Sequence, residues 1–201
     1  MTRLRIRYTA RLLVHPLSLL PLGLLLFDAT FGLLSINPIQ DVILRTGKAA
    51  LILLIASLAC TPLNRLTGWK WVMALRKPLG LYSFGYVSLH LIAFAVLDFG
   101  LDFALIGQEI AEKRYIVAGF ASFVLLLPLA LTSTRAAQRR LGRQWRLLHR
   151  LVYPAALLAT LHYLWLAKVP REPLIFLTLL LVLLALRLPW TRLKPQRMPG
   201  K

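Results

Sequence analysis

Few residues of this sequence could do redox or metal chemistry. Among its 201 residues there is a single cysteine, Cys60. One cysteine excludes an intrachain disulfide, a thiolate-ligated iron–sulfur cluster, a covalent haem attachment through CxxCH and a cysteine zinc site. Such chemistry must therefore rest on the four histidines, which are His15, His90, His149 and His162.

Two of the histidines, His90 and His162, lie deep inside long apolar segments. At 1.5 Å per residue, His90 is roughly 16 Å and His162 roughly 22 Å from the starts of their segments. Two imidazoles at one level on separate helices supply the two axial nitrogens of a b-type haem, with iron as the metal and no covalent attachment. The alternative is that both are interior residues and that the small residues beside them, Ala155 and Ala159, serve only helix packing.

The other two histidines are more ambiguous. His149 precedes His162 by thirteen residues, which is roughly 20 Å along a helix but a rotation of about 220°, so the two rings do not share a face. Its two interpretations are a second cofactor level below the first and an interfacial residue among arginines. His15, which precedes Pro16, is interpreted as a residue at the start of a helix.

The elements that must position these residues are membrane-spanning helices. Apolar residues make up 58% of the chain, above the roughly 45–50% of soluble domains. They form six stretches of near-spanning length, about 17–25 residues, which predict an all-α polytopic helical bundle. The predicted spans are Leu12–Leu34, Ile43–Leu63, Leu79–Leu97, Tyr115–Leu131, Leu147–Leu166 and Leu174–Pro189.

Charge predicts the orientation of this bundle. The chain has 25 Lys+Arg and 7 Asp+Glu, a net charge of +18. The two termini and the second and fourth connections hold 19 of the basic residues, and all seven acids lie on the other side. By the positive-inside rule, both termini are cytoplasmic. This asymmetry explains the basic charge without nucleic acid.

The chain organisation is simple. We expect one membrane domain over residues 1–190 and a basic cytoplasmic tail over 191–201, and we detect no internal repeat. No carboxylate lies in the middle of a predicted span, so an ion-coupled transporter lacks its usual groups. The absence of a GxGxxG motif argues against hydride uptake from NAD(P)H by the chain itself.

Several segments together resemble the MsrQ (YedZ) family, from about Arg11 to Pro189. The segments that carry the resemblance are Asn37-Pro38, Thr46-Gly47-Lys48, Thr61-Pro62-Leu63, Arg76-Lys77-Pro78-Leu79-Gly80-Leu81, Leu89-His90-Leu91, Leu131-Thr132-Ser133-Thr134, Arg140-Leu141-Gly142, Trp145, Leu148-His149-Arg150-Leu151-Val152-Tyr153 and Leu161-His162-Tyr163 with Trp165. The resemblance implies a haem-binding membrane subunit of a periplasmic methionine sulfoxide reductase system, of the ferric-reductase-like transmembrane group.

What the resemblance implies is specific. It implies a bacterial inner-membrane protein with b-type haem and flavin mononucleotide (FMN), which passes electrons to the periplasmic molybdenum-containing reductase MsrP. His90, His149 and His162 match the family's haem-associated histidines. The oxidase relatives carry a fourth, which this sequence lacks, leaving a second haem or a flavin open at the level of His149. The electron donor is then a cytoplasmic flavin reductase or quinol.

Two pairs of cations are candidates for cofactor anions. Arg45 and Lys48, at the outer end of the second span, are placed to meet haem propionates or, alternatively, lipid headgroups. Arg76 and Lys77, at the cytoplasmic start of the third span, are placed to meet a flavin phosphate or, alternatively, serve only as topology signals.

The sequence therefore predicts a membrane electron-transfer subunit of an oxidoreductase system, which does not itself act on methionine sulfoxide. The alternative function is a small-molecule transporter or an assembly scaffold without haem. A transporter is expected to show broken helices or inverted repeats around a polar midplane site, and the sequence shows neither.

Overall fold

The chain folds into a bundle of helices. The structure is a computed structural model that describes residues 2–187, with side chains for residue 5 and residues 7–187. The predicted tail 191–201, Trp190 and the end of the sixth predicted span lie outside the described residues. The described helical segments are α1 (Thr2–Thr30), α2 (Pro38–Thr67), η1 (Lys70–Ala74), α3 (Arg76–Ile92), η2 (Ala93–Asp98), α4 (Phe103–Glu112), α5 (Arg114–Leu131), α6 (Arg135–Leu141), α7 (Arg143–Leu148), η3 (His149–Leu151), α8 (Val152–Leu166) and α9 (Arg171–Ala185).

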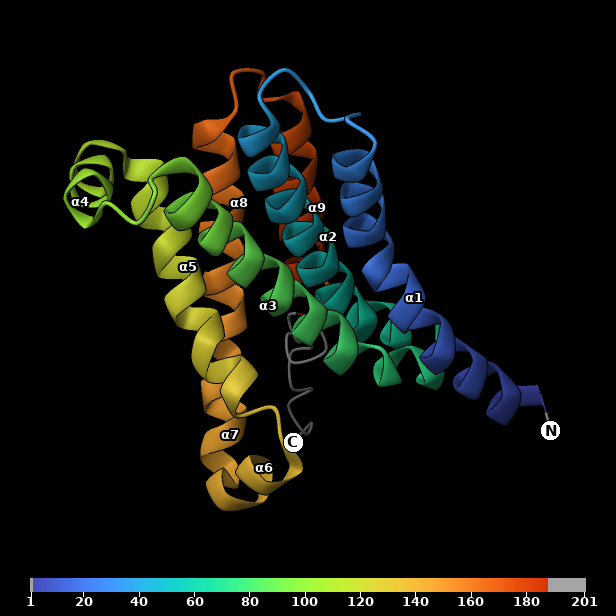
Figure 1. The fold of residues 1–201 in the computed structure, drawn as a ribbon. Coiled ribbons are helices and arrows are strands. Elements are labelled where there is room, and N and C mark those ends of the chain that lie inside the picture. The colour runs from blue at the N-terminus through green and yellow to red at the C-terminus, as the bar shows by residue number, and fades with distance from the viewer. Residues whose placement is uncertain (1, 188–201) are drawn as a thin grey trace, which may run out of the picture.

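The long helices run up and down the bundle in alternation (Figure 1). α2 packs along α3, α5 along α8, and α1 and α9 flank these pairs. The N-terminus lies at the end of the bundle that holds α6 and α7, whereas α4 and the α1–α2 and α8–α9 connections lie at the opposite end (Figure 1). This arrangement agrees with the predicted alternation of the chain.

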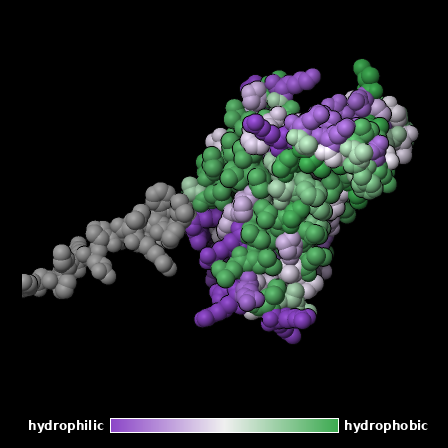
Figure 2. All heavy atoms as spheres, turned by 90° about the vertical axis from the view of Figure 1, so that its left-hand side faces the viewer, coloured by the Kyte–Doolittle hydropathy of each residue, from purple (hydrophilic) through white to green (hydrophobic). Residues whose placement is uncertain are grey.

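The surface of the bundle suits a membrane. A broad apolar band separates polar side chains at the two ends of the face shown in Figure 2. Within residues 2–187, four helices are long and apolar enough to cross a bilayer, at Arg7–Thr30, Pro38–Thr67, Arg76–Asp98 and Arg114–Leu131. α8 and α9 have 15 residues each, below the roughly 20 that a perpendicular span needs. The structure thus supports a multi-pass membrane protein, and six spans remain a prediction.

Local capping explains why α2 is longer than the predicted second span. Its first turn begins at Pro38, and the side chain of Asn37 accepts a hydrogen bond from the backbone N–H of Gln40. Proline at the first helical position and asparagine at the N-cap both favour a helix start. The helix ends at Gly68, whose φ of 71° is left-handed. Arg45 therefore lies two turns inside a helix.

The connection between α3 and α5 is more ordered than the sequence predicts. Residues 98–114, which connect the third and fourth predicted spans, contain α4, whose start is capped by the Asp102 carboxylate accepting from the N–H groups of Ala104 and Leu105. The segment Ala93–Asp98, which continues from α3, is a π-helix that begins three residues after His90. Such segments often occur beside functional sites.

The core lies where α2, α5, α8 and α9 meet. Leu58 on α2 and Leu180 on α9 are almost fully buried, and Ala155 and Ala156 on α8 have no exposed surface. Small side chains let α8 approach its neighbours closely. This packing holds α8 at the centre of the bundle and fixes the level of His162.

Candidate functional site

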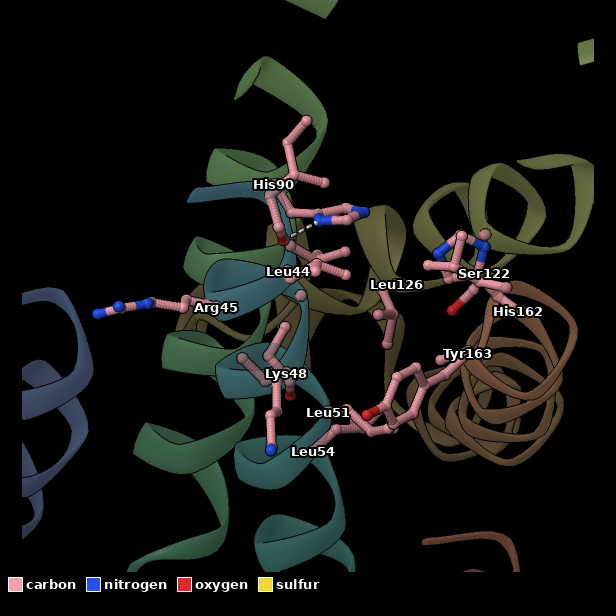
Figure 3. A pocket seen from close by; sticks show the side chains of 18 of the residues that line it. Leu44, Arg45, Lys48, Leu51, Leu54, His90, Ser122, Leu126, His162 and Tyr163 are labelled. Atoms are coloured by element: carbon pink, nitrogen blue, oxygen red, sulfur yellow. Dashed lines mark hydrogen bonds between the residues drawn. The ribbon is translucent and has the colours of Figure 1, made fainter. Parts of the chain in front are cut away.

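The structure brings His90 and His162 together. The two ring centroids are 6.0 Å apart and the ring planes are nearly perpendicular, at 81°. The rings enter one cavity from opposite sides, from α3 and from α8 (Figure 3). The two imidazoles therefore face each other across a space between separate helices.

Each of these imidazoles is oriented by a backbone carbonyl of a neighbouring helix. Nδ1 of His90 lies 2.8 Å from the carbonyl oxygen of Ile43, and Nδ1 of His162 lies 2.6 Å from that of Tyr115. A carbonyl oxygen can only accept, so each Nδ1 must carry the proton, and in a neutral ring Nε2 keeps its lone pair. Metal-ligating histidines are fixed in this way.

The cavity around the two rings has a volume of about 330 Å³. Its walls include Gly47, Ala50, Gly119 and Ala159. Glycine has no side chain and alanine only a methyl group, so these residues leave room for a flat ligand. Among the described residues, no group of three or more histidine, cysteine, aspartate or glutamate side chains could hold a metal ion. The donor set is thus an imidazole pair in an apolar space, which fits a haem iron with two axial nitrogens.

Arg45 and Lys48, the cations predicted to meet haem propionates, both have carboxylate partners. Arg45 bonds to Asp28, and its Nε lies 2.8 Å from the Asp41 carboxylate. Its guanidinium points away from the histidines (Figure 3). Lys48 pairs with Glu172, whose carboxylate also accepts from the Tyr163 hydroxyl at 2.7 Å. Arg45 therefore ties α1 to α2 and Lys48 ties α2 to α9, and both residues line the cavity.

His149 lies in a second cavity of about 210 Å³. Its ring stacks on that of Trp145 with centroids 3.9 Å apart, and its Nδ1 is 3.1 Å from the Trp145 carbonyl oxygen. Arg76 and Lys77 line the same cavity. The structure thus groups His149 with these two cations and separates it from the histidine pair.

The two cavities are neighbours along the bundle. Leu54 of α2 and Leu126 of α5 line both of them. His15 lines neither cavity, and its Nδ1 lies 3.0 Å from the Tyr82 hydroxyl. We call the cavity with His90 and His162 the outer cavity and the one with His149 the inner cavity, after the predicted orientation.

Sequence reasoning missed the residues that shape the outer cavity beside the histidines. A Cβ built on Gly47 would lie 2.9 Å from Nδ1 of His90, and one built on Gly119 would lie 2.8 Å from Nδ1 of His162. One signal was available, because both glycines precede their histidines by 43 residues.

Comparison of the sequence with known proteins identifies the family to which the chain belongs. Residues 46–160 match the family described as ferric reductase like transmembrane component. That range contains His90 and His149 and ends two residues before His162. It therefore covers α3, α5 and most of α8.

Curated relatives match over nearly the whole chain. Proteins named "Protein-methionine-sulfoxide reductase heme-binding subunit MsrQ" are 43% identical in Xanthomonas euvesicatoria pv. vesicatoria, 45% in Ralstonia nicotianae and 46% in Rhodospirillum rubrum. These alignments cover 94%, 90% and 89% of this chain and 89%, 85% and 86% of the relatives, respectively. At this similarity and coverage, the chain belongs to the MsrQ family and to the wider ferric reductase-like transmembrane family.

Proposed function

We propose that this protein is the haem-binding electron-transfer subunit of a methionine sulfoxide reductase system in the bacterial inner membrane. The observation that carries the proposal is the facing pair of His90 and His162, each with Nδ1 on a backbone carbonyl. The relatives' name, which describes a heme-binding subunit, supports the same reading. The protein would pass electrons outward and would not itself reduce methionine sulfoxide.

The residues that would hold a b-type haem are those of the outer cavity. His90 and His162 would supply the axial nitrogens to the iron, and the small residues of the walls would admit the ring. Iron cycling between two oxidation states would supply one-electron chemistry. Lys48, at the wall, and then Arg45 are our candidates for the haem propionates. Both carry acid partners that a propionate would have to displace.

The membrane arrangement that we propose has six spans over residues 1–190, with both termini and the basic tail 191–201 in the cytoplasm. Two features support it, the alternating direction of the long helices (Figure 1) and the 19 basic residues on one predicted side. α8 gains length from α7 and η3, which precede it without a gap.

The inner cavity is our candidate for FMN. Arg76 and Lys77 would neutralise the flavin phosphate, while Trp145 and His149 offer stacked aromatic surface. A second haem at His149 is the alternative occupant. Electrons would reach this level from a cytoplasmic flavin reductase or from quinol, and leave from the outer cavity to the periplasmic molybdenum-containing subunit MsrP.

The test is a spectrum followed by a vesicle assay. Purified protein should show a reduced-minus-oxidised difference spectrum typical of low-spin b haem. In sealed vesicles, a flavin reductase with NADH and FMN enclosed inside should then reduce ferricyanide outside. Protein without haem that still assembles in the membrane would contradict the proposal and favour a transporter or scaffold.

A further inference from the structure

The hydrogen bonds around the outer cavity repeat with a fixed shift of 72 residues. The bond from His90 to Ile43 becomes the bond from His162 to Tyr115 when 72 is added to both numbers. Gly47 becomes Gly119 under the same shift, and each glycine lies against the ring of its own histidine. The helix pair α2–α3 thus builds the same cradle as the pair α5–α8.

A second pair of bonds obeys the same shift with donor and acceptor exchanged. The Ser83 hydroxyl donates to the Ala50 carbonyl at 2.8 Å, and the Ser122 hydroxyl donates to the Ala155 carbonyl at 2.8 Å. The serine is on α3 in one pair and on α5 in the other. This corrects the expectation of no internal repeat. The two halves run in the same direction, as in repeats related by an axis along the membrane normal.

The two glycines in this repeat lie where any side chain would clash with a histidine ring. A Cβ on Gly47 would lie 2.9 Å from Nδ1 and 3.1 Å from Cε1 of His90. A Cβ on Gly119 would lie 2.8 Å from Nδ1 and 3.0 Å from Cε1 of His162. These atoms belong to rings held by hydrogen bonds. By contrast, a Cβ on the helical glycine Gly85 would meet nothing within 4 Å.

The position of each glycine explains how the imidazole reaches the backbone carbonyl. Because glycine has no side chain, it leaves that carbonyl uncovered. In a helix, the carbonyl of residue i lies beside residue i+4. Gly47 is four residues after Ile43, and Gly119 is four residues after Tyr115. A larger residue there would cover the carbonyl that receives the imidazole Nδ1–H.

We propose that Gly47 and Gly119 are positioning residues for the two axial histidines. Each exposes one carbonyl, which binds Nδ1–H and aims Nε2 of His90 or His162 into the outer cavity. This inference rests on the proposed function, since it gives the imidazoles the role of iron ligands. It adds the element of the fold that fixes their orientation.

The test compares Gly47→Ala and Gly119→Ala with Gly85→Ala, a change on α3 in open space. Haem affinity, the low-spin EPR signal and the midpoint potential are measured on purified protein, and the melting temperature is measured without haem. We expect each cradle variant to lose haem affinity by about 10–100-fold, as for other partners of metal ligands. In the haem that remains, a weaker Nδ1–H bond makes the imidazole a poorer electron donor, so the EPR signal should shift and the potential rise. Gly85→Ala should match the parent in all three.

The outcomes separate this inference from the proposed function. If the parent binds no low-spin haem, the proposed function fails. If the parent binds haem and both cradle variants match Gly85→Ala in affinity, signal and potential, the positioning role is wrong. Both rings border the outer cavity, so without haem a ring displaced by an added methyl group has room to move, and we expect the fold to tolerate alanine. A cradle variant that cannot fold without haem would therefore also overturn the positioning role.

Discussion

The outer and inner cavities share two wall residues, Leu54 and Leu126, but offer different chemistry. The outer cavity presents two imidazoles, each held by a carbonyl of another helix. The inner cavity presents one imidazole, that of His149, which is held by a carbonyl four residues earlier in its own chain segment. Only the outer cavity has the paired nitrogen donors that a six-coordinate haem iron takes from histidine.

The repeat explains this difference. Shifted by 72 residues, His162 corresponds to His90, but His149 corresponds to Lys77. Both Lys77 and His149 line the inner cavity. The same register that supplies a second imidazole to the outer cavity supplies a cation to the inner one. The inner cavity therefore suits an anionic aromatic ligand such as the proposed FMN.

The largest expected effect comes from removing the proposed axial ligands in the outer cavity. His90→Ala and His162→Ala should each abolish the low-spin b-haem spectrum, because one axial nitrogen cannot hold six-coordinate iron. His149→Ala, the matched change in the inner cavity, should leave that spectrum largely intact. Difference spectra of the three purified variants test this. A full spectrum in either outer variant would contradict the ligand assignment, and complete haem loss in His149→Ala would favour two haems or a different ligand pair.

The next prediction concerns the inner cavity. Replacing Arg76 and Lys77 together by glutamine should lower the bound flavin without changing haem content, because the phosphate loses its charge-assisted hydrogen bonds. Lys70→Gln, an exposed change in η1 that does not line the cavity, is the control. Flavin released by denaturation and haem are measured on the same samples. Unchanged flavin in the double variant would argue that both cations act only in topology.

A smaller effect is expected at the wall of the outer cavity. By Coulomb's law, a positive charge ~10 Å from a redox centre would contribute about 1.7 kcal/mol at an effective dielectric of ~20. Lys48 is half-exposed, so screening by solvent and salt weakens its electrostatic contribution. We therefore expect the haem midpoint potential of Lys48→Gln to lie a few tens of millivolts below that of the parent. Arg45→Gln should shift the potential less, because its guanidinium points away and has two carboxylate partners. A redox titration in which Lys48→Gln overlays the parent would exclude a propionate role.

Much of the fold was predictable because apolar runs mark helices directly. The predicted span Tyr115–Leu131 differs by one residue from α5, and the small residues Ala155 and Ala159 lie where α8 meets its neighbours and the outer cavity. The approach of His90 to His162 followed from comparable depth in two helices that start from the same side. These features depend on local composition and on helix geometry.

Other features depend on contacts between segments that are distant in sequence. The repeat escaped detection because backbone carbonyls carry half of each hydrogen bond, and any residue supplies a carbonyl. Thus Ile43 and Tyr115 play one role with unlike side chains. The ion pair between Arg45 and Asp28 was not predicted, because it needs α1 and α2 side by side. Helix α4 was missed because the cap at Asp102 was not weighed as a helix start.

The smallest expected effect tests whether the two halves of the repeat are energetically equivalent. Ser83→Ala and Ser122→Ala each remove one buried hydrogen bond between helices, and both bonds are 2.8 Å long. Such bonds contribute about 0.6 kcal/mol between membrane helices, so each variant should melt about 1–3 °C below the parent. Ser88→Ala is the control, because the Ser88 hydroxyl donates to Phe84 within its own helix and should leave the melting temperature unchanged. Equal losses at Ser83 and Ser122 would mean that exchanging donor and acceptor between the helix pairs preserves the strength of the contact. A lower melting temperature in Ser122→Ala alone, where α8 packs at the centre of the bundle, would show that the two cradles have the same geometry but contribute unequally to stability.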